Sequence, residues 1–262
     1  MVRVLSALVL LPLVVAIIGL MPAFATDVLA AVVAVLAFTE YATIAGRMRV
    51  TVWRTLGAAF TVMLCLAIGL GLPLDVVVIA FAVALGGVAV AFGRPDRELY
   101  DTLCATLFGV LYVGAPIGAL IAIRGRWGPS AVFLVLFTVI VSDTAQYYAG
   151  RLFGHTPLAP ALSPKKTVEG AIGGLIAASI AVPVLALWWL PGRPQWLLAG
   201  VGAVLALVGI IGDLFESQLK RTAGVKDASG LIPGHGGMLD RIDSLLFVAP
   251  VFYVFMLALP TP

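Results

Sequence analysis

Long, nearly uninterrupted apolar runs constrain this sequence more than any other feature. A helix needs about 20 apolar residues to cross a bilayer, with a range of about 17–25. The sequence has nine such runs, at residues 4–20, 28–45, 55–72, 74–92, 102–123, 130–149, 167–190, 196–212 and 242–259. Because lipid cannot satisfy backbone N–H and C=O groups, and because the runs lack period-2 alternation, they are expected to be helices. The sequence therefore predicts an all-α polytopic integral membrane protein with about nine spans.

Composition excludes the main alternatives. The chain is 62% hydrophobic and 11% charged, whereas a soluble domain is about 25% charged. Its 28 Gly and 16 Pro are scattered rather than repeated, which argues against a disordered or collagen-like chain. Cys65 and Cys104 lack the spacing of a zinc site. The net charge of +3 forms no basic stripe on a soluble element, so we expect no nucleic-acid partner.

The first apolar run has an alternative explanation. Arg3, the run itself and the stretch Ala23-Phe24-Ala25 together resemble a signal peptide with its cleavage site. The run has 17 residues, which is longer than the usual signal core of about 7–15. We therefore expect a retained helix.

Positive charge is unevenly divided between alternate loops. Thirteen of the sixteen Lys and Arg residues fall on one set of loops, and the other set holds Arg124, Arg126 and Arg193. The positive-inside rule then places the N-terminus in the cytoplasm and the C-terminus outside. We expect a multi-pass protein of the inner (cytoplasmic) membrane, with five spans in residues 1–123 and four spans plus the polar loops in residues 124–262.

Charge is concentrated in residues 213–243, which hold nine of the 29 charged residues. Asp213 ends the eighth predicted span, and Asp240 and Asp243 begin the ninth. If the eighth helix continues for a further turn or two, one face carries Asp213, Glu216, Ser217 and Lys220. A solvated loop is the alternative. Carboxylates gathered in a partly dry site repel each other unless a cation intervenes, and hard oxygen ligands suit Mg²⁺.

The same segment contains the stretch Pro233-Gly234-His235-Gly236-Gly237. Glycine permits backbone conformations in which successive N–H groups bind phosphate oxygens, although a flexible turn would have the same composition. Basic residues are interspersed with the carboxylates and offer charge-assisted donors to a polyphosphate. They are Lys220, Arg221, Lys226 and Arg241.

A second polar group accompanies the sixth predicted span. Asp143 follows a long apolar run, and an intramembrane acid is a functional candidate, with a helix-packing hydrogen bond as the alternative. Arg151, Lys165 and Lys166 follow it, and they either obey the positive-inside rule or hold an anionic head group. Under the predicted topology, all these residues and the carboxylates of residues 213–243 meet at the cytoplasmic leaflet.

The start of the seventh predicted span suggests structural roles. Thr167 can cap the helix, with Glu169 in its first turn. Small residues on one face suit close helix packing, either within the subunit or at the seam of a homodimer. They are Gly170, Gly174, Ala177 and Ala178.

The polar stretches resemble a known family. Residues 217–221, Lys226-Asp227 and residues 233–243 look like the signature of the phosphatidate cytidylyltransferases, also called CDP-diacylglycerol synthases. Residues 142–144, 150–154 and 163–170 are similar to other marked stretches of that family. The resemblance covers the C-terminal half by motif and the N-terminal half by hydropathy alone. This sequence departs from the pattern at Gln146 and His155.

The resemblance implies transfer of CMP from CTP to phosphatidic acid, which gives CDP-diacylglycerol and pyrophosphate. It also implies Mg²⁺ and a second cation, for which K⁺ is a candidate. The expected principal metal ligands are Asp213 and Asp240. The residues expected to act in catalysis are Lys220, Arg221, Lys226, Asp227, His235, Arg241 and Asp243, with Asp227 and Asp243 as alternate ligands. The residues expected to contact substrate are Asp143, Arg151, Lys165, Lys166, Ser217, Gly236 and Gly237.

Other functions fit the sequence less well. A transporter or channel would need polar residues across the whole bilayer, whereas the outer halves of the spans are almost wholly apolar. A polyprenyl phosphate or an isoprenoid ether lipid stays open as an alternative acceptor. The DGxxAR pattern of the CDP-alcohol phosphotransferases and a Walker loop are both absent from the sequence.

Overall fold

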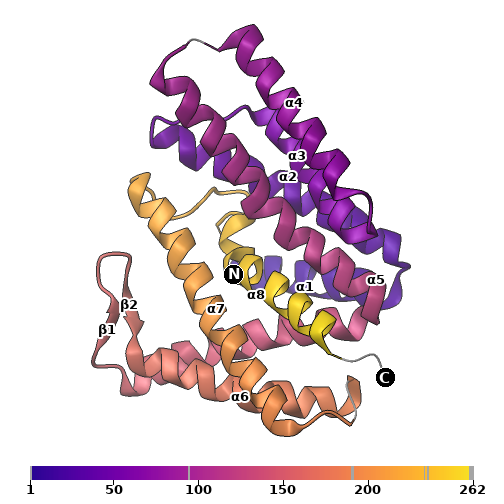
Figure 1. Ribbon diagram of the computed structural model, residues 1–262. Coiled ribbons are helices and arrows are strands. Elements are labelled where there is room, and N and C mark those ends of the chain that lie inside the picture. The colour runs from indigo at the N-terminus through magenta and orange to yellow at the C-terminus, as the bar shows by residue number, and fades with distance from the viewer. Residues whose placement is uncertain (1, 94, 190–191, 233, 235, 260–262) are drawn as a thin grey trace. The chain divides into compact units, whose positions relative to one another are not determined.

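The computed structural model describes residues 2–93, 95–189, 192–232, 234 and 236–259. In these residues the chain forms eight helices and one two-stranded sheet (Figure 1). The helices are α1 (Val2–Leu20), α2 (Ala23–Arg47), α3 (Arg54–Leu70), α4 (Leu74–Phe92), α5 (Arg97–Phe153), α6 (Val168–Trp189), α7 (Gln195–Thr222) and α8 (Leu239–Ala258).

Six of these helices, α2 and α4 to α8, are long and apolar enough to cross a membrane. The structure thus confirms a helical, multi-pass architecture. The number of crossings and the sides on which the termini lie stay predictions.

Helix α5 has a break at Gly128, where φ is 81° and ψ is −177°. Only glycine adopts such a conformation without strain. The predicted spans 102–123 and 130–149 lie on either side of this residue, so two predicted spans correspond to the two arms of α5.

The sheet is a departure from the all-α prediction. Strands β1 (Pro157–Ala159) and β2 (Ser163–Thr167) pair antiparallel between α5 and α6. Three prolines in this connection, Pro157, Pro160 and Pro164, prevent it from continuing as a helix, because proline has a fixed φ and no N–H.

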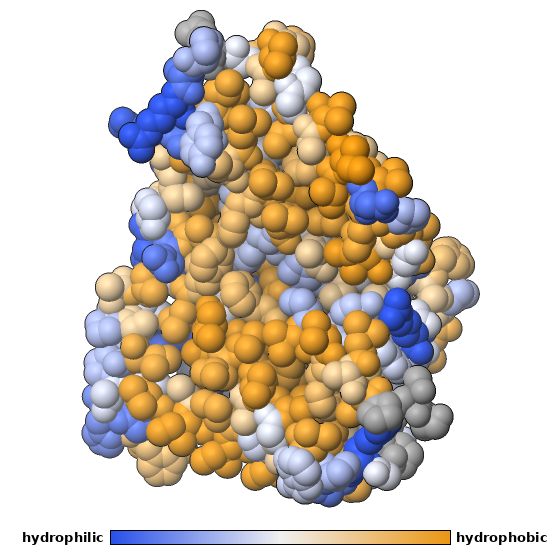
Figure 2. Space-filling model, in the orientation of Figure 1, coloured by the Kyte–Doolittle hydropathy of each residue, from blue (hydrophilic) through white to orange (hydrophobic). Residues whose placement is uncertain are grey.

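Large apolar side chains cover much of the surface, as the face in Figure 2 shows. Helix α4 is the extreme case, since Val83 and Val90 are 69% and 89% exposed. An apolar surface of this extent is unfavourable in water and favourable in lipid. It supports a membrane environment for the chain.

The chain divides into two compact units, which are described separately. Unit 1 comprises residues 1–126 and 219–242, and unit 2 comprises residues 127–218 and 243–262. Residues 219–242, which carry much of the motif, therefore group with the N-terminal helices. The division expected at residue 123 is of another kind, since it separates the first five spans from the four spans that carry the catalytic loops. It stays a prediction.

In unit 1, the second half of α2 is fixed against the first arm of α5. Phe38 and Tyr41 are buried, and the Tyr41 hydroxyl donates to the Ala105 carbonyl at 2.9 Å. A Cβ at Gly109 would collide with both rings, so this glycine permits the close approach of the two helices. The residue between these anchors, Glu40, is thereby held in a defined place.

Arg124, also in unit 1, secures the end of α1. Its guanidinium donates to the carbonyls of Ile18 and Met21, both at 3.2 Å. A cation is favourable at a helix C-terminus, where carbonyls lack helical partners. Arg124 thus has a structural role besides its place in the predicted topology.

In unit 2, the start of α6 packs on the end of α5. The Thr167 hydroxyl accepts from the Gly170 N–H at 3.1 Å, which confirms the predicted cap. The Glu169 carboxylate accepts from the His155 and Thr156 N–H groups at 3.1 and 3.2 Å, and so fixes the chain that leads into the sheet.

The small-residue face of α6 is used within unit 2. A Cβ at Gly170 or Gly174 would collide with the backbone or side chain of Gln146 in α5. Close packing inside one subunit therefore accounts for these glycines. The homodimer stays a prediction.

Candidate functional site

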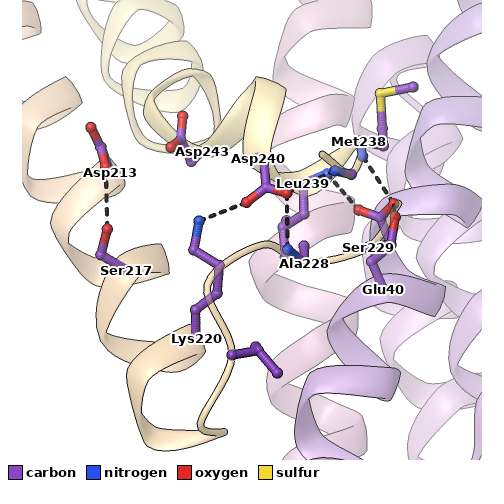
Figure 3. Close-up of polar contacts among 12 residues, drawn as sticks. Glu40, Asp213, Ser217, Lys220, Ala228, Ser229, Met238, Leu239, Asp240 and Asp243 are labelled. Carbon is purple, nitrogen blue, oxygen red and sulfur yellow. Dashed lines mark hydrogen bonds and ion pairs between the residues drawn. The ribbon is translucent and has the colours of Figure 1, made fainter. Parts of the chain in front are cut away.

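The chain between α7 and α8, in unit 1, is organised around a lysine–aspartate pair (Figure 3). Lys220 Nζ donates to Asp240 Oδ1 at 2.6 Å, and the side chains of the two residues are 11% and 6% exposed. The structure thus brings together two residues that the sequence assigned to the site from positions twenty residues apart.

The other oxygen of Asp240 holds the loop. Asp240 Oδ2 accepts from the backbone N–H groups of Ala228 at 2.9 Å and Gly237 at 2.7 Å. Gly236 has a φ of +81°, and a Cβ there would lie 2.6 Å from Asp240 Oδ2. Gly236 is therefore required by its backbone conformation and by close packing against the Asp240 carboxylate. The N–H of Gly237 serves an internal hydrogen bond, and its predicted contact with substrate stays a prediction.

A second carboxylate, which the sequence analysis missed, reaches the same loop. Glu40 of α2 is 6% exposed and points toward the loop in Figure 3. Its oxygens accept from the Ser229 hydroxyl at 2.6 Å, the Met238 N–H at 2.9 Å and the Leu239 N–H at 2.7 Å. One feature of the sequence could have identified Glu40: it is the single acid within the apolar run 28–45. A carboxylate inside a membrane span is a functional candidate.

The other predicted residues of unit 1 lie near the surface. The Arg221 guanidinium donates to the Val225 carbonyl at 3.0 Å, which closes the turn after α7. Lys226, Asp227 and Arg241 are exposed. His235 lies outside the described residues.

A second lysine–aspartate pair lies in unit 2. Lys166 of β2 forms an ion pair with Asp213 of α7, and their side chains are 21% and 28% exposed. The Ser217 hydroxyl donates to Asp213 Oδ1 at 3.4 Å, which confirms that these two residues share a helix face. Asp143 of α5 interacts electrostatically with both Lys166 and Asp213. Three predicted residues thus form one cluster; Asp143 and Lys166 belong to two of the similar stretches, and Asp213 lies outside them.

Gln146, one of the departures from the family pattern, supports this cluster. Its side-chain amide donates to Asp143 Oδ1 at 3.0 Å and to the Ser142 hydroxyl at 3.2 Å. Of the other predicted residues here, Arg151 is exposed and donates to the Tyr147 hydroxyl at 3.5 Å, and Lys165 is exposed.

Two further acids of unit 2 lie on α7 and α8. Glu216 is 0% exposed, and the sequence analysis noted it without assigning it a role. Asp243 is partly buried, and its Oδ1 accepts from the Ser244 N–H at 2.6 Å. A Cβ at Gly212 would lie 2.8 Å from the Asp243 carbonyl oxygen, so glycine permits this approach of the helices.

The donor chemistry of both clusters fits a hard divalent cation. Among the described residues, no group of three or more His, Cys, Asp or Glu side chains could by itself hold a metal ion. Mg²⁺ in nucleotide sites commonly uses only one or two protein carboxylates, with substrate phosphates and water as its other ligands. A carboxylate has about four lone-pair positions, and Asp240 uses three. The assignment of Asp213 and Asp240 as ligands stays a prediction.

Comparison with known proteins identifies one family and relatives that share one name. The model of the cytidylyltransferase family matches residues 1–259. Proteins named phosphatidate cytidylyltransferase match from Staphylococcus haemolyticus, 41% identical over 152 residues, and Staphylococcus aureus, 40% identical over 153 residues; each match covers 58% of both chains. One from Mycobacterium bovis is 40% identical over 168 residues, 63% of this chain and 54% of the relative. The match thus spans less than two thirds of each relative. Because the family model covers nearly the whole sequence, the chain belongs to the cytidylyltransferase family.

Proposed function

We propose that this chain transfers CMP from CTP to phosphatidic acid, which yields CDP-diacylglycerol and pyrophosphate. The observation that carries the proposal is the formation of two lysine–aspartate pairs among the predicted site residues. Lys220 and Asp240, both in the signature, pair in unit 1, and Lys166, from another similar stretch, pairs with Asp213 in unit 2. The relatives, named phosphatidate cytidylyltransferase at about 40% identity, support the choice of nucleotide and acceptor.

The proposed reaction is an in-line displacement. A phosphate oxygen of the lipid attacks the α-phosphorus of CTP, a new P–O bond forms, and the bond to the departing pyrophosphate breaks. Side chains need to supply little bond chemistry, so catalysis depends on positioning and on stabilising charge. Asp213 and Asp240 are each proposed as a ligand for a divalent cation, with K⁺ as the proposed second cation, and the bound cations would neutralise phosphate charge.

The basic residues have complementary parts in this proposal. Lys220 and Lys166 are each held by an aspartate, so each ammonium already has a defined place before substrate binds. Arg221, Lys226 and Arg241 would neutralise the triphosphate and the leaving pyrophosphate. Preorganised cations stabilise developing charge without the reorganisation that solvent would require. Asp143, Arg151 and Lys165 would line the approach of the lipid phosphate.

We further propose that the site faces the cytoplasm, with nine crossings and the N-terminus inside. The excess of Lys and Arg in alternate loops supports this orientation. Single cysteines placed in a Cys65→Ser, Cys104→Ser background test it: a cysteine at Lys226 should react with an impermeant reagent only from the cytoplasmic side, and reaction from the outside would reverse the orientation.

The reaction is tested with the purified chain in detergent micelles. Label from [α-³²P]CTP should enter a chloroform-soluble product with phosphatidic acid, and chelation with EDTA should abolish the transfer until Mg²⁺ is restored. A parallel reaction contains a polyprenyl phosphate. Label only in the second reaction would favour the alternative acceptor. Absence of label in both, together with ion flux in liposomes, would overturn the proposal in favour of a transporter.

A further inference from the structure

We propose that Glu40 is a positioning residue, which fixes the loop between α7 and α8 and thereby holds Lys220 and Asp240 in their places. The part of this inference that concerns catalysis rests on the proposed function. The part that concerns the loop rests on the geometry of unit 1 alone.

The carboxylate of Glu40 bonds to residues that lie far away in the sequence, and both of its oxygens accept hydrogen bonds. The carboxylate accepts three hydrogen bonds of 2.6 to 2.9 Å from residues 189 to 199 positions later in the chain. Helix α2 is itself anchored next to this residue by Tyr41. A rigid helix in the N-terminal half therefore fixes the segment that carries the family signature.

The three donors match a carboxylate better than its amide. Two of them, Met238 and Leu239, present backbone N–H groups at the start of α8. The first N–H groups of a helix lack helical partners, and the helix dipole favours negative charge beside them. A glutamine would offer one acceptor oxygen and would turn an NH₂ group toward another donor.

Gly237 joins the two carboxylates. A Cβ at this position would lie 2.6 Å from Glu40 Oε1, so only glycine admits the Glu40 side chain. The N–H of the same residue donates to Asp240 Oδ2. Displacement of Glu40 would therefore move the backbone that orients Asp240, and so disturb the hydrogen bond between Asp240 and Lys220.

The test compares Glu40→Gln with Glu98→Gln in the full chain. Glu98 is a matched control, since it is exposed and its carboxylate accepts a long hydrogen bond of 3.4 Å from the Thr51 hydroxyl. Two readouts are needed: hydrogen exchange of the backbone amides of residues 228–239 without substrate, and kcat and KM for CTP per folded molecule, with folding followed by thermal melting.

In Glu40→Gln, we expect the Met238 and Leu239 amides to exchange at least about 10-fold faster, because the loop opens locally. We expect kcat to fall about 10- to 100-fold and KM for CTP to change less than about 3-fold, because misplacement costs transition-state alignment more than ground-state binding. Glu98→Gln should match the unaltered chain in both readouts.

Unchanged exchange in Glu40→Gln would overturn the inference, and so would a lower melting temperature with kcat per folded molecule unchanged. If the unaltered chain transfers no CMP, the proposed function fails while hydrogen exchange still judges the role of Glu40 in the loop. If Glu40→Gln does not fold, Ser229→Ala serves instead. It removes one of the three donors to Glu40, together with the acceptor of the Leu231 N–H, and should still speed exchange at Leu239. Normal exchange at Leu239 and normal kcat in Ser229→Ala would contradict the proposal.

Discussion

The two lysine–aspartate pairs have the same chemistry and opposite surroundings. Asp240 in unit 1 is 6% exposed and accepts from two backbone N–H groups in addition to Lys220. Asp213 in unit 2 is 28% exposed and accepts from one hydroxyl in addition to Lys166. The first pair is built into a folded loop, whereas the second retains freedom to exchange partners. An ion pair in a motif can thus support structure and chemistry together, or chemistry alone.

The largest effect is expected for Asp240→Asn, which tests whether the Lys220–Asp240 pair supports both structure and chemistry. We expect CMP transfer to fall by more than about 1,000-fold and the free energy of unfolding to fall by roughly 3 kcal/mol, because the buried Lys220 ammonium loses the negative charge of Asp240 beside it. Product formation from labelled CTP and thermal melting in detergent measure the two effects. Asp101→Asn is the control, since its pair with Arg97 is exposed and such pairs contribute about 0–1 kcal/mol.

Asp213→Asn should separate activity from stability. We expect transfer to fall about 100-fold or more, with a loss of stability below about 1 kcal/mol, because the pair with Lys166 is partly solvated. The same assay and melting curve apply. If Asp213→Asn destabilises the chain as much as Asp240→Asn does, the two pairs are equivalent and the comparison fails.

Lys166→Met tests whether the lysine of the second pair contributes to catalysis. We expect a loss of about 10- to 100-fold in kcat/KM for CTP, since a positioned cation is removed from the cluster. Lys165→Met, its exposed neighbour in β2, should lose less. Initial rates over a range of CTP concentrations measure both variants. A larger loss for Lys165→Met would mean that the exposed lysine is the one that holds phosphate.

The smallest effect is expected for Thr167→Ala. Loss of the cap on α6 should lower the free energy of unfolding by about 1 kcal/mol and leave transfer within about 2-fold. Thermal melting measures it, with Thr51→Ala as a control that removes only a long, exposed hydrogen bond. A large loss of activity would show that the cap also positions Lys166.

The sequence was most informative where the controlling interactions are local. Apolar runs predicted helices because lipid forces backbone hydrogen bonds to close within each segment. The spacing of Asp213 and Ser217 predicted a shared face, and Thr167 predicted a cap, because each depends on one helical turn. In each case a single element determines the outcome.

The features that the sequence did not predict depend on residues far apart in the chain, and the spacing of residues along the sequence does not indicate which of them make contact. The contacts of Glu40 join residues 189 to 199 positions apart, so its role was visible only in the folded chain. The sheet at residues 157–167 arises from pairing across a short proline-containing connection. Arg124 was counted only as a topology signal, although its guanidinium also secures the end of α1.

The long separation between Glu40 and its donors has a consequence for biosynthesis. At about 5–20 residues per second, the ribosome adds Ser229 and Leu239 about 10–40 s after Glu40. Throughout that interval the Glu40 carboxylate, on a helix apolar enough to cross a membrane, lacks the donors that later bond to it. The hydrogen bonds that fix the signature loop to α2 can therefore form only after Leu239 has been added to the chain.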